Sequence, residues 1–320
     1  MAPRIVRGDA DIRAVQDLAS RLWPVGWHPG GLGWALARGQ LADEVVLFEG
    51  ADGVSAWAAR SVHEPGELLA QVDPARADVA DEVVAWLLAS AGSLRATVEV
   101  HEGDATLASA LRRGGFVPDA GAPVVGMFRP AGRADRGGDG WTVRAVRDDE
   151  LPARVAVHRA AWKPATLPWV DGRVTAPEAE SSFTAAAYEA VRRTWLYRQD
   201  LDLVAVAPDG ELAGCCIAWF DPVTGVAEIE PLGVAPGHRR RGVAVALCLE
   251  VAARVAAAGG HEVFINTGPQ EEYPAPAAAY AKAGFRVEQR ATTYVRAGTQ
   301  ANGGPRMTWT GAATVTSGVG

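Results

Sequence analysis

The chain has 320 residues, a net charge of −7 and 48% hydrophobic residues, which is ordinary for a globular protein of about two domains. The negative charge disfavours a general nucleic-acid binder, because such proteins usually present a basic face. No apolar stretch is long and uninterrupted enough to span a bilayer, and the first residues, MAPRIVRGDADIRAV, lack the apolar core of a signal peptide. Three cysteines without a C-x-x-C pair favour a reducing compartment. We therefore expect a cytoplasmic protein without nucleic-acid or membrane partners.

The first part of the chain begins with a short strand at 4–7 and an amphipathic helix, followed by a hairpin with a D-G turn at 52–53. A strand ending in V-D-P at Pro74 comes next, and then a long helix rich in Ala, Val and Leu. The alternating run LRATVEV predicts a further strand, and a short helix ends in Gly-Phe at 115–116.

The same order of patterns recurs in the second part of the chain. A strand at 142–145, a D-G turn at 209–210, V-A-P ending at Pro236, the strand EVFINT and a Gly-Phe at 284–285 match their counterparts. The spacing between equivalent positions grows slowly along the chain and never shrinks. This is expected for an internal duplication whose second copy carries an insertion.

The repeated order of strands and helices predicts a mixed α/β sheet with helices on both faces. The stretch RPAGRADRGGDG is typical of a linker, and the Gly-rich end of the chain is typical of a flexible tail. We therefore predict these parts: a first domain at 1–130, a linker at 131–140, a second domain at 141–297 and a tail at 298–320.

A basic turn in an acidic chain, PLGVAPGHRRRGVA, follows the central strand of the second copy. A helix is expected to begin near 240–242, and the start of a helix attracts anions through unpaired N–H groups. Gly242 and Ala244 permit close approach to the backbone, and Arg239 and Arg241 can bind phosphate oxygens. A diphosphate is the natural ligand. The turn lacks the lysine of a Walker loop and the glycine spacing of a dinucleotide fingerprint, but a solvated turn stays an alternative.

The pattern V-x-P-x-x-R-x-x-G-x-A, formed by Val234, Pro236, Arg239, Gly242 and Ala244, resembles the acetyl-CoA signature of the GNAT N-acetyltransferase superfamily. The resemblance implies two tandem GNAT-like domains, each a mixed, mostly antiparallel central sheet flanked by helices with a V-shaped cleft. It also implies acetyl-CoA as acyl donor. In the family this loop binds the pyrophosphate through backbone amides, a role that the resemblance gives to Arg239, Arg240, Arg241, Gly242, Val243 and Ala244.

Pro231 interrupts the strand AEIEPLGV, because proline cannot donate a ladder hydrogen bond, and a bulge is expected there. In the family a bulge at this point separates two parallel strands and admits the pantetheine arm. By resemblance, the arm pairs with the backbone of Leu232, Gly233 and Val234. A family asparagine that often contacts the cofactor corresponds to Asn266.

Glu228 and Glu230 lie two apart on one strand, so their side chains share a face. Two carboxylates beside an apolar cleft can act as the general base with a raised pKa. A tyrosine at the position of Tyr280 often protonates the coenzyme A thiolate in the family. The alternatives are solvated strand residues for the glutamates and a core aromatic for the tyrosine.

The insertion at 158–198 is rich in aromatic residues. Family members commonly form the wall of the acceptor site from this region, which suggests acceptor contacts for Trp162, Trp169 and Tyr188. An aromatic stripe is also typical of a core, and both interpretations stay open. The histidines show no zinc-binding spacing, so we predict no metal site.

The first copy lacks the residues that carry this chemistry. Its counterpart of the basic turn reads VDPARADVADE, where Asp78, Asp81 and Glu82 replace neutral or basic residues and would repel a diphosphate. We expect this copy to be structural.

Together these patterns predict an N-acetyltransferase that moves an acetyl group from acetyl-CoA to a primary amine of a small molecule, as a monomer or homodimer. The alternative of a different class is a non-catalytic acyl-CoA-binding or sensory protein. A nucleic-acid binder that uses HRRRG is a third and weaker interpretation.

Overall fold

The computed structural model describes residues 3–41, 44–62, 66–132, 140–162, 181, 183–268 and 274–298. Among these residues, the chain divides into two compact units, which are described separately. Unit 1 comprises residues up to 123 together with those from 289 onward, and unit 2 comprises residues 124–288.

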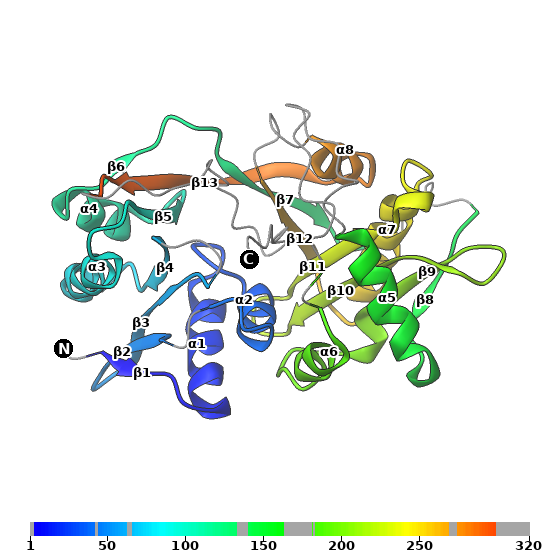
Figure 1. Cartoon of the computed structure of the whole chain (residues 1–320), viewed down its shortest axis with the longest axis horizontal. Helices are drawn as coiled ribbons and strands as arrows, with labels where there is room; N and C mark the ends of the chain where they lie inside the picture. The colour runs from blue at the N-terminus through cyan, green and yellow to red at the C-terminus, as the bar shows by residue number, and fades with distance from the viewer. Residues whose placement is uncertain are drawn as a thin grey trace. The chain divides into compact units, whose positions relative to one another are not determined.

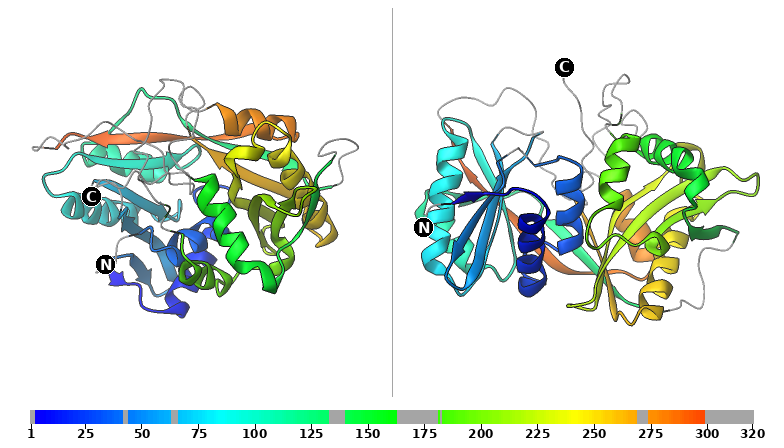
Figure 2. Two further views of the ribbon diagram at one scale, coloured as in Figure 1. Left: turned by 45° about the vertical axis from the view of Figure 1, so that its right-hand side comes forward. Right: turned by 90° about the horizontal axis from the view of Figure 1, so that it is seen from below.

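Unit 1 is built on one sheet whose strands are antiparallel except for one parallel pair, β4 and β5. In spatial order the strands are β1 (Arg4–Ile5), β2 (Val46–Gly50), β3 (Gly53–Arg60), β4 (Glu67–Val72), β5 (Ala96–His101) and β13 (Arg286–Arg296), with β6 (Val117–Pro118) paired to β13. The helices are α1 (Asp9–Leu22), α2 (Pro29–Ala37), α3 (Ala77–Ala91) and α4 (Ala105–Arg113). Separate hydrophobic clusters cover the two faces of the sheet, one under α1 and α2 and one under α3 and α4 (Figure 2).

Unit 2 repeats this plan, again with one parallel pair, β11 and β12, in an otherwise antiparallel sheet. In spatial order the strands are β7 (Val124–Pro130), β12 (Glu262–Thr267), β11 (Val226–Val234), β10 (Leu212–Asp221), β9 (Asp202–Val206) and β8 (Thr142–Ala145). The helices are α5 (Leu151–Ala161), α6 (Ala185–Arg192), α7 (Val243–Ala257) and α8 (Ala275–Lys282), with short 3-10 turns η1 (Asp148–Glu150), η3 (Gln199–Leu201) and η4 (Pro236–His238). Helix α5 crosses one face of the sheet and α7 packs on the other (Figure 1).

The neighbouring residues Cys215 and Cys216 show how β10 serves both faces. Cys215 packs with Val157 of α5, whereas Cys216 packs with Leu247 of α7, as the alternation of side chains along a strand requires. Both thiols are free and fully buried, and burial raises the pKa of Cys215 to about 11. They act as small core residues, in line with the sequence.

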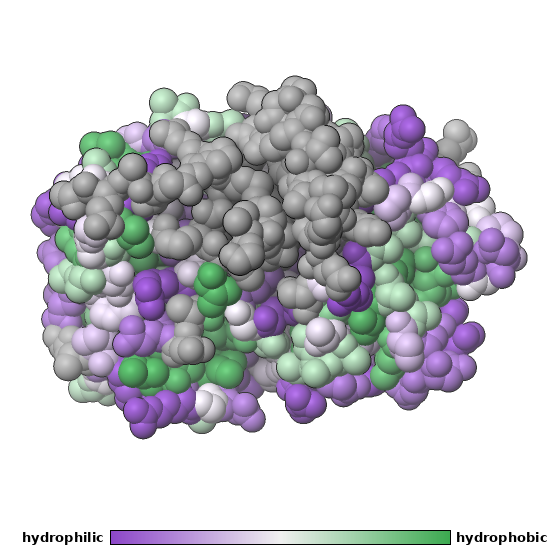
Figure 3. All heavy atoms as spheres, in the orientation of Figure 1, coloured by the Kyte–Doolittle hydropathy of each residue, from purple (hydrophilic) through white to green (hydrophobic). Residues whose placement is uncertain are grey.

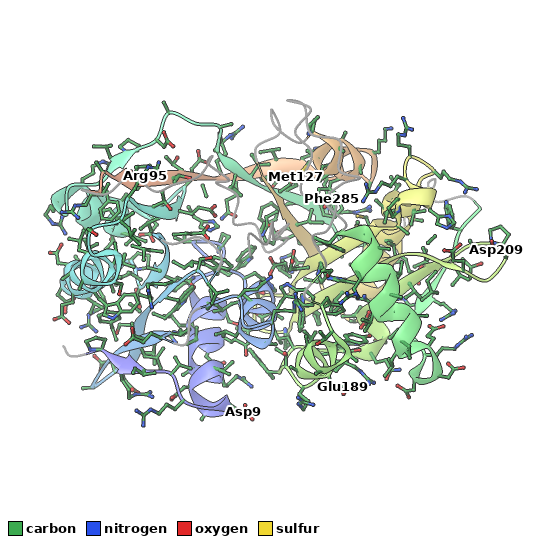
Figure 4. The ribbon with its side chains drawn as sticks, in the orientation of Figure 1. Asp9, Arg95, Met127, Glu189, Asp209 and Phe285 are labelled. Atoms are coloured by element: carbon green, nitrogen blue, oxygen red, sulfur yellow. The ribbon has the colours of Figure 1, made fainter. Side chains whose placement is uncertain are left out.

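The last strand of each sequence copy belongs to the unit built mainly from the other copy. Strand β7 follows the first copy along the chain but pairs with β12, and Met127 and Phe285 share the core of unit 2 (Figure 4). Likewise, the end of β13 pairs with β5 in unit 1. The compact units therefore divide the chain differently from the repeat, on which the predicted boundaries at 130 and 141 rest.

The predicted fold class is confirmed, because each unit is a mixed, mostly antiparallel sheet flanked by helices. Both D-G turns close hairpins, β2–β3 and β9–β10. Asp209 marks the second turn in Figure 4, and Gly210 takes a φ of 89° that favours glycine. Most of the predicted linker and nearly all of the predicted tail lie outside the described residues.

Candidate active site

The parallel ladder between β11 and β12 is short. It runs from the pair Val226–Glu262 to the pair Glu228–Phe264, and both strands continue beyond it, β11 to Val234 and β12 to Thr267. Beyond Glu228, β11 keeps its pairing with β10, and β12 keeps its pairing with β7. The backbone edge of β11 after Glu228 is therefore not used by β12, which supports the V-shaped cleft that we propose between these two strands.

A bulge interrupts β11 at the expected place. Cys216 pairs with Leu232 and Ala218 with Ile229, so Glu230 and Pro231 together stand opposite Ile217. Such an extra residue changes which face the following side chains occupy. The indole N–H of Trp219 donates a hydrogen bond to the carbonyl of Glu230 and holds the bulge from β10.

The two glutamates are buried, with 3% of Glu228 and 4% of Glu230 exposed, and are not solvated strand residues. They lie on the face opposite Ala227 and Ile229, which pack under α7. Burial and the neighbouring charge of Glu228 raise the pKa of Glu230 well above its ordinary value. The Nδ2 of Asn266 donates to Oε1 of Glu228 at 3.4 Å, so Asn266 contacts a proposed catalytic residue.

The hydrogen bonding of this pair is incomplete within the described part of the chain. Among the residues that the structure describes, Oε1 of Glu230 is buried and has no hydrogen-bond partner. A buried polar atom without a partner costs about 1–3 kcal/mol, more if charged. The cost is offset if a bound ligand supplies a donor.

The basic turn leads into α7 with two left-handed residues. Arg240 has a φ of 59°, and Gly242, the N-cap residue, has a φ of 86°. The N–H of Ala246 donates to the carbonyl of Gly242, so the N–H groups of Val243 and Ala244 precede the first helical hydrogen bond. They lie at the positive end of the helix dipole. Arg240 is exposed, and hydrophilic residues gather along the right-hand edge of the surface in Figure 3.

Arg239 is engaged with the protein itself. Its Nε donates to the carbonyl of Val234 at 3.2 Å, and its Nη2 donates to the carbonyl of Ala161 at 2.8 Å. The side chain therefore ties the end of β11 to the end of α5. The phosphate contact that the sequence predicts for Arg239 stays a prediction, and the structure adds this bracing role.

Trp162 covers the α5 side of β11. Its ring stacks on His158 with centroids 4.3 Å apart, and a Cβ built on Gly233 would lie 2.0 Å from the ring. No residue with a side chain fits at position 233 unless the tryptophan moves. The predicted acceptor residue Trp162 is thus placed directly over the strand edge that we propose for pantetheine.

Tyr188 occupies a buried polar network under α5 and α6. Its hydroxyl donates to Asp202 at 2.5 Å, Tyr197 donates to the same oxygen at 3.1 Å, and Nε of Arg154 donates to the other oxygen at 2.9 Å. Arg154 and Asp202 are fully buried, and Tyr188 is 1% exposed. We therefore propose that Tyr188 supports the acceptor wall from within. Trp169 lies outside the described residues.

Tyr280 lies on α8 and is 7% exposed. Its ring lies 6.2 Å from that of Phe285 and belongs to the hydrophobic cluster under α7. These surroundings match the core-aromatic alternative, and the proton-donor role remains a prediction to be tested.

Unit 1 has the same parallel ladder, but not the long basic turn that follows β11 in unit 2. Pairing between β4 and β5 ends at Leu68–Val98, but four residues, 73–76, join β4 to α3, whereas eight, 235–242, join β11 to α7. Because the connection in unit 1 is shorter, Asp78, Asp81 and Glu82 lie within α3 and not on a turn before it. Asp78 pairs with Arg76 at 2.9 Å in the first turn of α3.

No group of three or more potential metal ligands occurs in the described part of the chain. Within the same residues, no helix is long and apolar enough to cross a membrane.

Several solved structures share this fold. A GCN5-related N-acetyltransferase from Sphaerobacter thermophilus is 22% identical with a TM-score of 0.54, covering 92% of this chain and 95% of its own. Also similar is a tandem GNAT protein from the clavulanic acid biosynthesis pathway, which is 14% identical with a TM-score of 0.58 and covers 92% of this chain and 97% of its own. A GNAT-family acetyltransferase from Colwellia psychrerythraea is 14% identical with a TM-score of 0.57 and covers 92% of this chain and 99% of its own. The chain thus has the tandem GNAT fold.

The family model of the acetyltransferase (GNAT) family matches residues 165–285. The matched residues include β11, the basic turn and α7. This match supports acyl transfer with acetyl-CoA as donor. A comparison with curated proteins gave no significant match.

Proposed function

We propose that unit 2 transfers the acetyl group of acetyl-CoA to a primary amine of a small molecule, by direct attack within a ternary complex. The observation that carries the proposal is the arrangement along β11. One strand bears the two buried glutamates, Glu228 before its bulge and Glu230 within it, and leads, after the bulge, into the basic turn at the start of α7. A diphosphate at the helix start and a thioester at the bulge would lie at the two ends of the same strand segment.

The donor would be held mainly by backbone groups. The N–H groups of Val243 and Ala244, with Gly242 and the neighbouring Arg240 and Arg241, are suited to the diphosphate. The pantetheine amides would pair with the open edge of β11 at Leu232–Val234. Trp162 would close the α5 side of this segment.

The acid–base steps follow from the two glutamates and Tyr280. The amine nitrogen attacks the thioester carbonyl, so that a C–N bond forms and the C–S bond breaks. Burial and the neighbouring Glu228 raise the pKa of Glu230, so the two glutamates together form the site that would accept the amine proton. Tyr280 would return a proton to the coenzyme A thiolate.

The proposal is tested by following thiol release from acetyl-CoA with a panel of small primary amines. We expect release with at least one amine and a loss of about 10²–10⁴-fold in kcat when Glu228→Gln and Glu230→Gln are combined. The matched control is Glu288→Gln, which removes an exposed carboxylate from the same unit. Binding of coenzyme A without thiol release for any amine would instead favour a non-catalytic acyl-CoA-binding protein.

A further inference from the structure

Trp141 contacts the basic turn from outside it. The residue is half-buried and packs against the core of unit 2 immediately before β8. Its indole N–H donates to the carbonyl of Arg241 at 2.8 Å. Its ring also meets the ring of His238 edge-on, with centroids 5.8 Å apart. One side chain from the start of the second copy therefore holds both ends of the turn HRRR.

The hydrogen bond to Arg241 determines where the next N–H points. The peptide between Arg241 and Gly242 is trans, so its C=O and N–H point in opposite directions. Because Trp141 holds the carbonyl, the N–H of Gly242 is directed away from the indole. It is the N–H that immediately precedes those of Val243 and Ala244 at the start of α7. Such successive N–H groups form a concave anion site.

The ring of Trp141 also holds the positive charge of Arg241 in place. The guanidinium of Arg241 lies over the Trp141 ring, 5.6 Å from its centroid, and Arg241 is exposed. A cation–aromatic contact of this kind restricts a long side chain without covering its donors. Arg241 is thereby held beside the helix start and needs less ordering to meet an anion.

We propose that Trp141 is a positioning residue for the diphosphate of the acyl donor. It acts through the Arg241 carbonyl, which orients the Gly242 N–H, and through the Arg241 guanidinium. This inference rests on the proposed function, because it concerns the same donor site. It predicts that Trp141 matters for donors that contain a diphosphate and not for donors that lack one.

The test compares Trp141→Phe, which keeps the ring and removes the N–H donor, with Trp141→Ala, which removes both. The control is Trp86→Phe, a half-buried tryptophan on α3 of unit 1. For Trp141→Phe we expect KM for acetyl-CoA and Kd for coenzyme A to rise about three- to tenfold, with kcat unchanged. Trp141→Ala should raise this KM and this Kd by ~10-fold or more. Trp86→Phe should leave the KM and the Kd unchanged.

The second measurement uses S-acetylpantetheine, a thioester donor without the diphosphate, with each variant. Its KM should be the same for the native protein and Trp141→Phe, which a general loss of folding or of core packing would not produce. An unchanged KM for acetyl-CoA in Trp141→Phe, or an equal loss with both donors, would overturn the inference. A native protein that binds no coenzyme A would contradict the proposed function, and this inference with it.

Discussion

Trp162 lies on Gly233 so closely that a single added methyl group would overlap its ring. Arg239 holds the two segments of this contact together, because its guanidinium donates hydrogen bonds to the carbonyls of both Ala161 and Val234. The end of α5 and the end of β11 are thus joined at the segment where we propose that the donor binds. A glycine is required here for space and not for backbone conformation.

Gly233→Ala should displace Trp162 and destabilise the protein by about 1–3 kcal/mol, as overpacking of a buried contact usually does. It should also raise KM for the acyl donor. Thermal unfolding and steady-state kinetics measure the two effects. The control is Gly237→Ala, where an added Cβ meets nothing within 4 Å, and both quantities should stay near native values.

Glu230→Gln should change how stability depends on pH. Because the pKa of Glu230 is raised above its ordinary value of 4.5, the folded protein retains a proton that the unfolded chain releases. The free energy of unfolding therefore falls as pH rises from 4.5 through the folded pKa, by up to about 1.4 kcal/mol per pH unit for one proton. Glutamine removes this slope, which denaturant titrations at several pH values measure. An identical slope in both proteins would contradict the assignment.

In the native enzyme, the same raised pKa predicts that activity increases with pH. Glu230 accepts a proton only where it has lost its own, so kcat should rise with pH through the raised pKa of Glu230. A pH–rate profile that is flat from mildly acidic to neutral pH would exclude the pair as the base.

Asp202→Asn should be among the most destabilising single changes. It removes a charge from a fully buried network and leaves Arg154 uncompensated, and breaking such a pair costs about 3–5 kcal/mol. Asp200→Asn is the control. The side chain of Asp200 is 58% exposed and that of its partner Arg198 is 40% exposed, so this ion pair is worth at most about 1 kcal/mol. Chemical denaturation of both variants measures the difference, and equal costs would contradict the network's role.

Tyr280→Phe separates the two interpretations of this residue. Phenylalanine keeps the ring that packs against Phe285, so the melting temperature should stay close to native. If the hydroxyl protonates the thiolate, kcat should fall about 10²-fold or more. A native kcat would leave Tyr280 as a core residue alone.

Much of this molecule follows from local sequence. The D-G turns set both hairpins, the proline at 231 sets the bulge, and the glycine before α7 sets the helix start. Each of these signals acts within a few residues, which is why pattern and composition suffice to predict them. The internal duplication was visible for the same reason, since its two copies preserve these short signals in order.

Other features depend on residues that are distant along the chain. The sequence alone determined the fold class, the bulge and the basic turn. Only the tertiary structure decided that β7 pairs with β12, that Trp162 covers Gly233 and that Trp141 holds the Arg241 carbonyl. It also decided that Arg239 braces two carbonyls and that Oε1 of Glu230 has no partner among the residues described. Contacts of this kind arise when separate elements pack, and no local pattern records which partner a side chain will meet.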